Sequence, residues 1–174
     1  MTVRLFRSED LPALHDANQA SVPGVSEESI EDLALWIDLA TCLVAADDSN
    51  RALGFITIMP LGLEQYPSDN MRWFEAYAKE TGKSVLYVDR IALSPTARGK
   101  GLGEALYEAA FAQFADVDEI GCEVNTRPLN PGSHRFHQRL GFAEIGTQVF
   151  VPGEKSVAYY VRGLRAGSPR YSAA

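Results

Sequence analysis

The sequence of 174 residues carries a formal net charge of −7, with 46% hydrophobic and 22% charged residues. This length and composition predict one globular domain with a buried core. An acidic chain lacks the basic face that a general nucleic-acid binder needs, so we expect no nucleic-acid partner.

Cysteine usage and hydropathy exclude further classes of protein. Cys42 and Cys122 lie far apart and match no zinc or redox spacing, so we expect small buried side chains and no metal. The first residues, MTVRLFRSEDL, lack the apolar core of a signal peptide, and no stretch approaches the ~20 apolar residues of a membrane span. We therefore predict a cytoplasmic protein with no membrane partner.

The first part of the chain is predicted to alternate between strands and helices. A strand at 3–7 is followed by a helix that begins at Ser8, where an N-cap residue precedes two acids. A second helix is predicted to begin at Ser26, because apolar residues follow it at helical spacing. Two runs rich in apolar residues, 41–46 and 52–59, predict a hairpin.

Residues 60–83 change in composition. A loop-like stretch leads into MRWFEAYAKETG, which predicts a short helix that ends at Gly82. The aromatic residues of 66–77 predict a small satellite core, and a lid over an acceptor site is the alternative.

The second half of the chain predicts a β-α-β unit. A strand at 84–93, a glycine-rich turn, a helix to about residue 114 and a strand at 118–125 should form a right-handed crossover between parallel neighbours. The remaining predicted elements are a helix at 133–140 and strands at 142–151 and 155–163. The fold class is α/β (α+β), with a mixed, mostly antiparallel sheet and helices on both faces. We expect one domain at 1–163 and a flexible tail at 164–174.

The turn ARGKGLGEA, residues 97–105, has the composition of an anion site. Glycine allows close approach of the backbone to a ligand, and N–H groups at a helix start attract anions. Arg98 and Lys100 add positive charge, so a diphosphate group is the expected ligand. The turn lacks the Walker pattern, and Glu104 replaces the last glycine of the dinucleotide fingerprint. A protein that binds ATP or NAD stays an alternative.

Two blocks of sequence carry a family resemblance. IALSPTARGKGLGEAL resembles the acyl-CoA site of the GNAT acetyltransferase superfamily, R/Q-x-x-G-x-G/A, with Arg98, Gly101 and Gly103 at its defined positions. NPGSHRFHQRLGF, which starts at Asn130, resembles the family's N-x-x-A/S-x-x-F-Y-x-x-x-G-F segment. MRWFEAY before YVDRIALSP is similar to an uncharacterised bacterial branch of the superfamily.

The resemblance implies an N-acetyltransferase of GNAT-like fold. It would transfer an acetyl group directly from acetyl-CoA to a small-molecule amine or peptide acceptor in a ternary complex. A non-catalytic module that binds or senses acyl-CoA is the alternative, and a homodimer through the last strands is left open. No metal is implied.

The resemblance also implies which residues hold acetyl-CoA. The main chain of the strand before the turn would pair with the pantetheine arm, and the turn's N–H groups would hold the pyrophosphate. Core packing is the alternative for Phe136. The residues implied are Ile91, Ala92, Leu93, Arg98, Gly99, Lys100, Gly101, Leu102, Gly103, Asn130, Ser133 and Phe136.

The catalytic acid departs from the family pattern. Where the family often has tyrosine, this sequence has His137, whose reference pKa near ~6.5 suits proton transfer. A histidine on the helix surface is the alternative role, and it fits His134 better. If His137 is not the acid, the donor is water or one of three tyrosines: Tyr87, Tyr159 and Tyr160.

The expected base is a carboxylate, Asp89 or Glu123. An alkyl amine has a reference pKa near ~10.4 and must lose a proton before it attacks. The two carboxylates lie in strands that are predicted to be parallel neighbours. An ion pair with an arginine elsewhere is the alternative for Asp89. Its sequence neighbour Arg90 is predicted to point to the opposite face of the strand.

Overall fold

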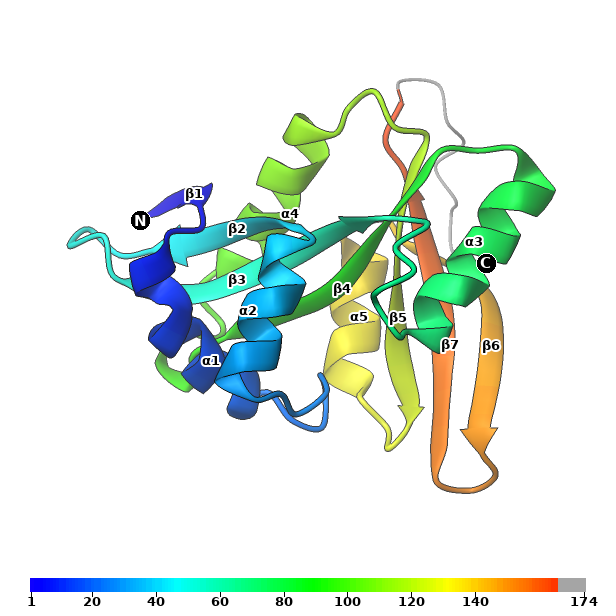
Figure 1. The fold of residues 1–174 in the computed structure, drawn as a ribbon, viewed down its shortest axis with the longest axis horizontal. Helices are drawn as coiled ribbons and strands as arrows, with labels where there is room; N and C mark the ends of the chain where they lie inside the picture. The colour runs from blue at the N-terminus through cyan, green and yellow to red at the C-terminus, as the bar shows by residue number, and fades with distance from the viewer. Residues whose placement is uncertain (166–174) are drawn as a thin grey trace. The chain divides into compact units, whose positions relative to one another are not determined.

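The computed structural model describes residues 1–165, which contain seven strands and five α-helices (Figure 1). The strands are β1 (Thr2–Leu5), β2 (Thr41–Ala46), β3 (Ala52–Pro60), β4 (Val85–Leu93), β5 (Glu119–Arg127), β6 (Ala143–Val151) and β7 (Lys155–Gly163). The helices are α1 (Leu11–Gln19), α2 (Ile30–Asp38), α3 (Asp69–Thr81), α4 (Leu102–Gln113) and α5 (Pro131–Arg139). Two short 3-10 turns, η1 (Ser8–Asp10) and η2 (Pro95–Ala97), complete the secondary structure.

The strands form one mixed sheet in the order β1-β2-β3-β4-β5-β7-β6. The pairs β1–β2, β2–β3, β5–β7 and β6–β7 are antiparallel. In the β4–β5 pair, Val85–Tyr87 run parallel to Glu119–Gly121. The predicted mixed α/β fold and its parallel crossover are therefore confirmed.

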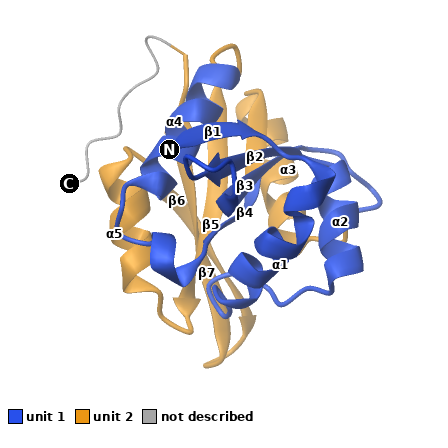
Figure 2. Cartoon of the chain, turned by 90° about the vertical axis from the view of Figure 1, so that its left-hand side faces the viewer, with its two compact units in different colours: residues 1–66, 88–114 blue, residues 67–87, 115–174 orange. Residues whose placement is uncertain are grey.

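Two compact units divide the chain (Figure 2). Unit 1 comprises residues 1–66 and 88–114, and the described part of unit 2 comprises residues 67–87 and 115–165. Strand β4 contributes residues to both units. The expectation of one acyltransferase domain over 1–163 stays a prediction.

The core of unit 1 lies between helices α1 and α2 and the sheet. Apolar side chains of the two helices meet those of β2, β3 and β4, as the helical spacing in the sequence predicts. The buried residues of this cluster are Leu14, Leu33, Ile37, Cys42, Val44, Phe55 and Ala92.

The first helices begin later than the sequence predicts. Ser8 opens the 3-10 turn η1, and the α-helix starts at Leu11. The second helix starts at Ile30 and not near Ser26, because Ser29 is its N-cap and accepts a hydrogen bond from the Asp32 N–H at 3.0 Å. The residues just before it are held by tertiary hydrogen bonds instead of helical ones.

The core of unit 2 includes the inner face of α3. Met71 and Phe74 are fully buried, and Phe74 meets Tyr87 and Tyr159 at centroid distances of 5.5 Å each. This packing confirms the predicted satellite core for the helical part of 66–77, whereas Tyr66 meets Trp36 in unit 1. Helix α3 ends at Gly82, as predicted.

Both cysteines are buried, as predicted, and neither is part of a disulfide bond within the described residues. Burial raises the pKa of the Cys42 thiol to about 12. Most of the predicted flexible tail lies outside the described residues. Its first two residues, Leu164 and Arg165, bond to the main chain of Asp118 and Asp116 at 2.9 and 2.8 Å.

Candidate acyl-CoA site

The glycine-rich turn connects β4 to α4 within unit 1. Gly99 and Gly101 have φ angles of 72° and 75°, in the left-handed region that glycine adopts without strain. Gly101 is the N-cap of α4. The first N–H groups of α4 therefore follow directly from a left-handed turn, which is the arrangement that an anion site needs.

Arg98 ties this turn to the end of α1. Its guanidinium donates to the main-chain oxygens of Leu93 at 3.2 Å and Ala20 at 2.7 Å. It also donates to Ser21 Oγ at 3.1 Å. Arg98 therefore stabilises the position of the turn. The sequence predicts in addition that its positive charge contributes to the anion site. Lys100 is exposed.

The strand before the turn places Ala92 in the core and leaves Ile91 and Leu93 half-buried. At this end of β4 the Ser94 N–H donates to the Leu53 oxygen of the β3 side at 2.8 Å. Residues 91–93, which were predicted to pair with pantetheine, are thus the last residues of β4 before the turn. Strand β3 is the neighbour of β4 in the sheet.

Asp89 and Arg90 are partners, and the prediction that they point apart is wrong. Arg90 Nε donates to Asp89 Oδ2 at 2.6 Å, and Tyr66 Oη donates to Asp89 Oδ1. Alternation in a strand separates the Cβ atoms, but a long arginine side chain can fold back to its neighbour. Both side chains are buried, with exposed fractions of 5% and 2%.

Arg90 extends this network to the segment before α2. It donates to Glu28 Oε1 at 3.0 Å and to Asn18 Oδ1 at 3.2 Å. Burial works to lower the pKa of the Arg90 guanidinium, but the adjacent Asp89 and Glu28 hold it above its ordinary value. Burial and the Asp89 carboxylate raise the pKa of Tyr66. The network therefore holds a charged arginine between two carboxylates.

Glu123 lies on β5 in unit 2. Its Oε1 accepts from Asn70 Nδ2 at 3.0 Å and from the Tyr87 hydroxyl at 3.1 Å. Its Oε2 is buried. The donors to Oε1 are neutral groups, in contrast to the arginine at Asp89.

Helix α5 carries the second motif block. Asn130 is its N-cap and accepts from the Ser133 N–H at 3.2 Å. Phe136 is half-buried, and Phe142, just beyond the helix, is buried. The residues predicted to line the pantetheine path therefore share one short helix in unit 2.

His137 is buried, so the alternative of a surface histidine is wrong for this residue. Its exposed fraction is 3%, and its Nδ1 bonds to the Ser133 main-chain oxygen at 2.8 Å. Burial lowers the pKa of His137 to about 4, and the hydrogen bond to Ser133 opposes that shift. His134 is half-buried and contacts the Tyr160 hydroxyl through Nδ1 at 2.8 Å.

A family model described as Acetyltransferase (GNAT) family matches residues 11–142. The chain belongs to the GNAT acetyltransferase family. This membership places it in a family of acyltransferase enzymes that use acetyl-CoA.

Curated relatives of this GNAT chain carry acetyltransferase names. An N-acetyltransferase of Streptomyces griseus is 34% identical over 109 residues, which are 60% of this chain and 48% of that protein. A mycothiol acetyltransferase of Propionibacterium freudenreichii subsp. shermanii is 25% identical over 173 residues, covering 95% of this chain and 50% of that protein. The chain spans about half the length of these relatives.

Solved structures share the GNAT fold. A phosphinothricin acetyltransferase (Pat) from Sinorhizobium meliloti, solved in complex with AcCoA, matches with a TM-score of 0.69 at 21% identity. The match covers 96% of this chain and 90% of that one. At this identity the likeness shows the fold.

Sequence reasoning missed three residues around the candidate carboxylates: Asn70, Tyr66 and Arg90 as a partner of Asp89. Asn70 and Glu123 are 53 positions apart, and no local pattern connects them. The hydrophobic periodicity of 66–77 signalled the core contacts of α3 and carried no information on its polar first turn.

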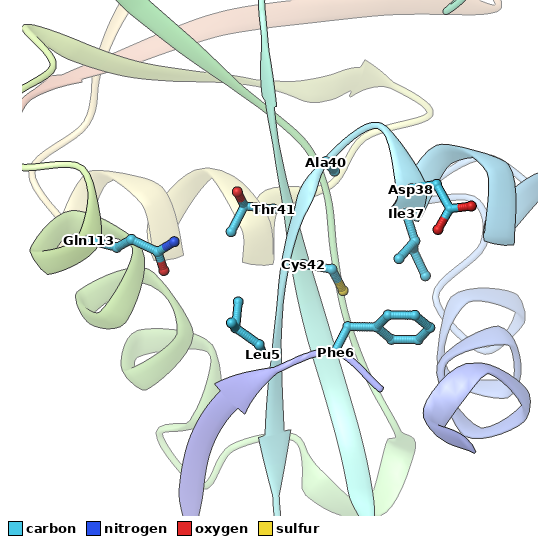
Figure 3. A pocket seen from close by; sticks show the side chains of 8 residues that line it. All are labelled: Leu5, Phe6, Ile37, Asp38, Ala40, Thr41, Cys42 and Gln113. Carbon is cyan, nitrogen blue, oxygen red and sulfur yellow. The ribbon is translucent and has the colours of Figure 1, made fainter. Parts of the chain in front are cut away.

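Unit 1 also contains a hollow of about 490 Å³, whose lining residues differ from those of the glycine-rich turn (Figure 3). Apolar side chains and the polar residues Asp38, Thr41 and Gln113 line it together, and among its described lining residues Asp38 is the one charged group. A hollow whose one charged lining group is a carboxylate does not suit a diphosphate. The lining residues are Leu5, Phe6, Ile37, Asp38, Ala40, Thr41, Cys42 and Gln113.

Two further properties concern the described residues alone. Within residues 1–165, no group of three or more His, Cys, Asp or Glu side chains is placed to hold a metal ion. No helix in that part of the chain is long and apolar enough to cross a membrane.

Proposed function

We propose that this chain is an N-acetyltransferase that transfers an acetyl group from acetyl-CoA directly to an amine acceptor in a ternary complex. The observation that carries the proposal is the left-handed Gly101 at the start of α4, in a chain of the GNAT family. The acceptor is a small-molecule amine or a peptide amine.

We infer that residues of the turn and residues of α5 bind acetyl-CoA. The N–H groups of residues 99–103 would hold the pyrophosphate, and the main chain of 91–93 would bond the amides of the pantetheine arm. Asn130, Ser133 and Phe136 would line the arm. Arg98 would act mainly by fixing the turn to α1, because its guanidinium already bonds to main-chain oxygens there. When bound, acetyl-CoA supplies the acetyl group as a reactive thioester.

Glu123 is the better candidate for the general base. Protonation of Asp89 would remove one charge from a buried ion pair with Arg90, which is costly. The Oε1 atom of Glu123 receives hydrogen bonds from an amide and a phenol, both of them neutral groups. We therefore assign proton removal from the acceptor amine to Glu123 and a structural role to Asp89.

His137 is a poor source of the proton for the leaving thiolate. With a pKa of about 4, about one imidazole in a thousand would be protonated at pH 7. In the neutral ring, Nδ1–H donates to the Ser133 oxygen. We therefore assign the proton donor to a tyrosine hydroxyl or to water. Burial raises the pKa of Tyr160 to about 12, which keeps that phenol protonated.

The decisive experiment is thiol release from acetyl-CoA with the purified chain and pools of amines, amino acids and peptides. Release that depends on one pool supports the proposal and names the acceptor class. Saturable binding of acetyl-CoA without release in any pool contradicts it and favours an acyl-CoA-binding module. Absence of binding contradicts both.

A further inference from the structure

Helix α3 packs against the strands of unit 2 (Figure 1). Ser68 caps it by accepting from the Met71 N–H at 3.2 Å. Trp73 stacks on Tyr159 of β7, with ring centroids 3.9 Å apart and planes at 12°. Gly146 of β6 makes room for this indole, since an added Cβ would lie 2.7 Å from Trp73 Cζ2. The first turn of α3 is therefore fixed against β6 and β7.

Asn70 in this first turn bridges two groups with opposite hydrogen-bonding roles. Its Nδ2 donates to Glu123 Oε1 at 3.0 Å, and its Oδ1 accepts from the Tyr159 hydroxyl at 2.9 Å. A carboxylate can only accept, so the amide nitrogen must face Glu123. The phenol then fixes the amide from the other side, and the Tyr159 hydroxyl also contacts Gln148 Oε1 at 2.9 Å.

We propose that Asn70 is a positioning residue whose amide holds the Glu123 carboxylate in the orientation needed to accept a proton from the acceptor amine. The inference rests on the proposed function, in which Glu123 is the base. Tyr87 on β4 donates to the same Oε1 at 3.1 Å, so two elements orient one oxygen. The aromatic contacts of α3 supply the rigidity that this orientation requires.

The chemistry of position 70 explains why an amide serves there. Hydrogen bonds to a carboxylate stabilise its charged form, while burial destabilises it. A carboxylate must be ionised before it can accept a proton. Neutral hydrogen-bond donors at Oε1 stabilise this ionised form of Glu123. Of the titratable groups described near this contact, Tyr87 on β4 donates to the oxygen itself, Tyr159 on β7 donates to Asn70, and the charge of Asp69 on α3 acts on Tyr159. Burial, followed by the charges of Glu123 and Asp69, raises the pKa of Tyr159, which therefore remains a donor.

Asn70→Asp tests the role with nearly the same shape. It replaces a donor by a second carboxylate beside Glu123, and two close carboxylates cannot both ionise freely. An acid in the first turn also favours the helix, so the variant should fold. Ala76→Asp is the matched control, because it adds the same charge to the exposed side of the same helix.

Two readouts are measured on both variants: the titration of the Glu123 carboxyl by ¹³C NMR and the pH profile of acetyl transfer. We expect Asn70→Asp to raise the midpoint of the Glu123 titration by roughly one pH unit or more, and to move the acidic limb of the rate profile by the same amount. Ala76→Asp should leave both near the wild-type values. An unchanged Glu123 titration in Asn70→Asp overturns the inference.

The NMR titration needs no acceptor, so it tests the Asn70 contact even where the chain shows no acetyl transfer. A shifted titration with an unshifted rate profile overturns the catalytic assignment of Glu123 and with it the positioning role. As a second variant, folded Asn70→Ala should lower kcat roughly tenfold and leave KM for acetyl-CoA unchanged. Wild-type kcat in that variant also overturns the inference.

Discussion

Arg90 Nε lies 2.6 Å from Asp89 Oδ2, although the two residues are consecutive in strand β4. The same guanidinium reaches Glu28 Oε1 at 3.0 Å, before α2. One buried arginine thus joins a strand residue that precedes the glycine turn to a segment more than sixty positions earlier. The Asp89 carboxylate is therefore part of a buried ion pair.

Arg90→Met should destabilise the protein strongly, because it leaves the buried Asp89 carboxylate and the half-buried Glu28 carboxylate without the cation that both contact. Breaking a buried ion pair from one side costs about 3–5 kcal/mol. Urea denaturation of wild type and variant measures the difference.

Arg51→Met provides the control for that experiment. Arg51 pairs with Asp47 at 3.1 Å, but its side chain is 77% exposed. Exposed pairs of this kind contribute about 0–1 kcal/mol. Similar losses in the two variants would show that the Arg90 network has no special role.

Glu123→Gln and Asp89→Asn should separate the base from the structural carboxylate. Glu123→Gln removes the proton acceptor and should lower kcat by about 10²–10⁴-fold, with stability near that of wild type. Asp89→Asn should mainly lower the free energy of unfolding, since it leaves Arg90 with one carboxylate fewer. The measurements are steady-state acetyl transfer and urea denaturation of both variants. The reverse pattern, with Asp89→Asn the more damaging to kcat, would transfer the base to Asp89.

His137 should make the stability depend on pH. Its pKa is lowered to about 4 in the folded chain, against a reference of ~6.5 in the unfolded chain. As the pH falls below ~6.5, His137 binds a proton in the unfolded state but stays neutral in the native state, so the free energy of unfolding decreases. The loss accumulates down to about pH 4 and reaches about 3 kcal/mol, because the side chain is buried.

Urea denaturation of wild type and His137→Phe between pH 7 and pH 4.5 checks this sign. The variant should lose less stability on acidification than wild type, whatever its stability at pH 7. Parallel curves for wild type and His137→Phe would contradict the buried, neutral state of His137.

Gly101→Glu should abolish saturable binding of acetyl-CoA. A carboxylate at the start of α4 would repel the pyrophosphate, and position 101 has φ of 75°, which side chains rarely adopt. Calorimetric titration with acetyl-CoA measures the loss.

Gly153→Glu is a closely matched control, because Gly153 has φ of 79° in the β6–β7 turn, and nothing lies within 4 Å of an added Cβ at either glycine. The backbone strain is therefore similar in the two variants. Equal loss of binding in both would attribute the effect to misfolding and not to an anion site at Gly101.

The sequence by itself determined the elements and the family. Alternating and helical spacing predicted β2 and β7 with their observed bounds, and the end of α3 at Gly82. The glycine turn and the block from Asn130 identified the GNAT resemblance, which the family model confirms. These features are local, because main-chain conformation, capping and side-chain periodicity depend on residues a few positions apart.

Tertiary structure alone decided the partners of the charged and polar side chains. Helical periodicity in α5 could not show that His137 is buried while His134 is half-buried, because the burial of a polar side chain depends on what packs against it. Strand alternation could not show that Arg90 turns back to Asp89, and nothing local links Asn70 to Glu123. Hydrogen bonds and ion pairs form over about 3 Å between groups that the fold brings together, so their identity depends on contacts between segments distant in sequence.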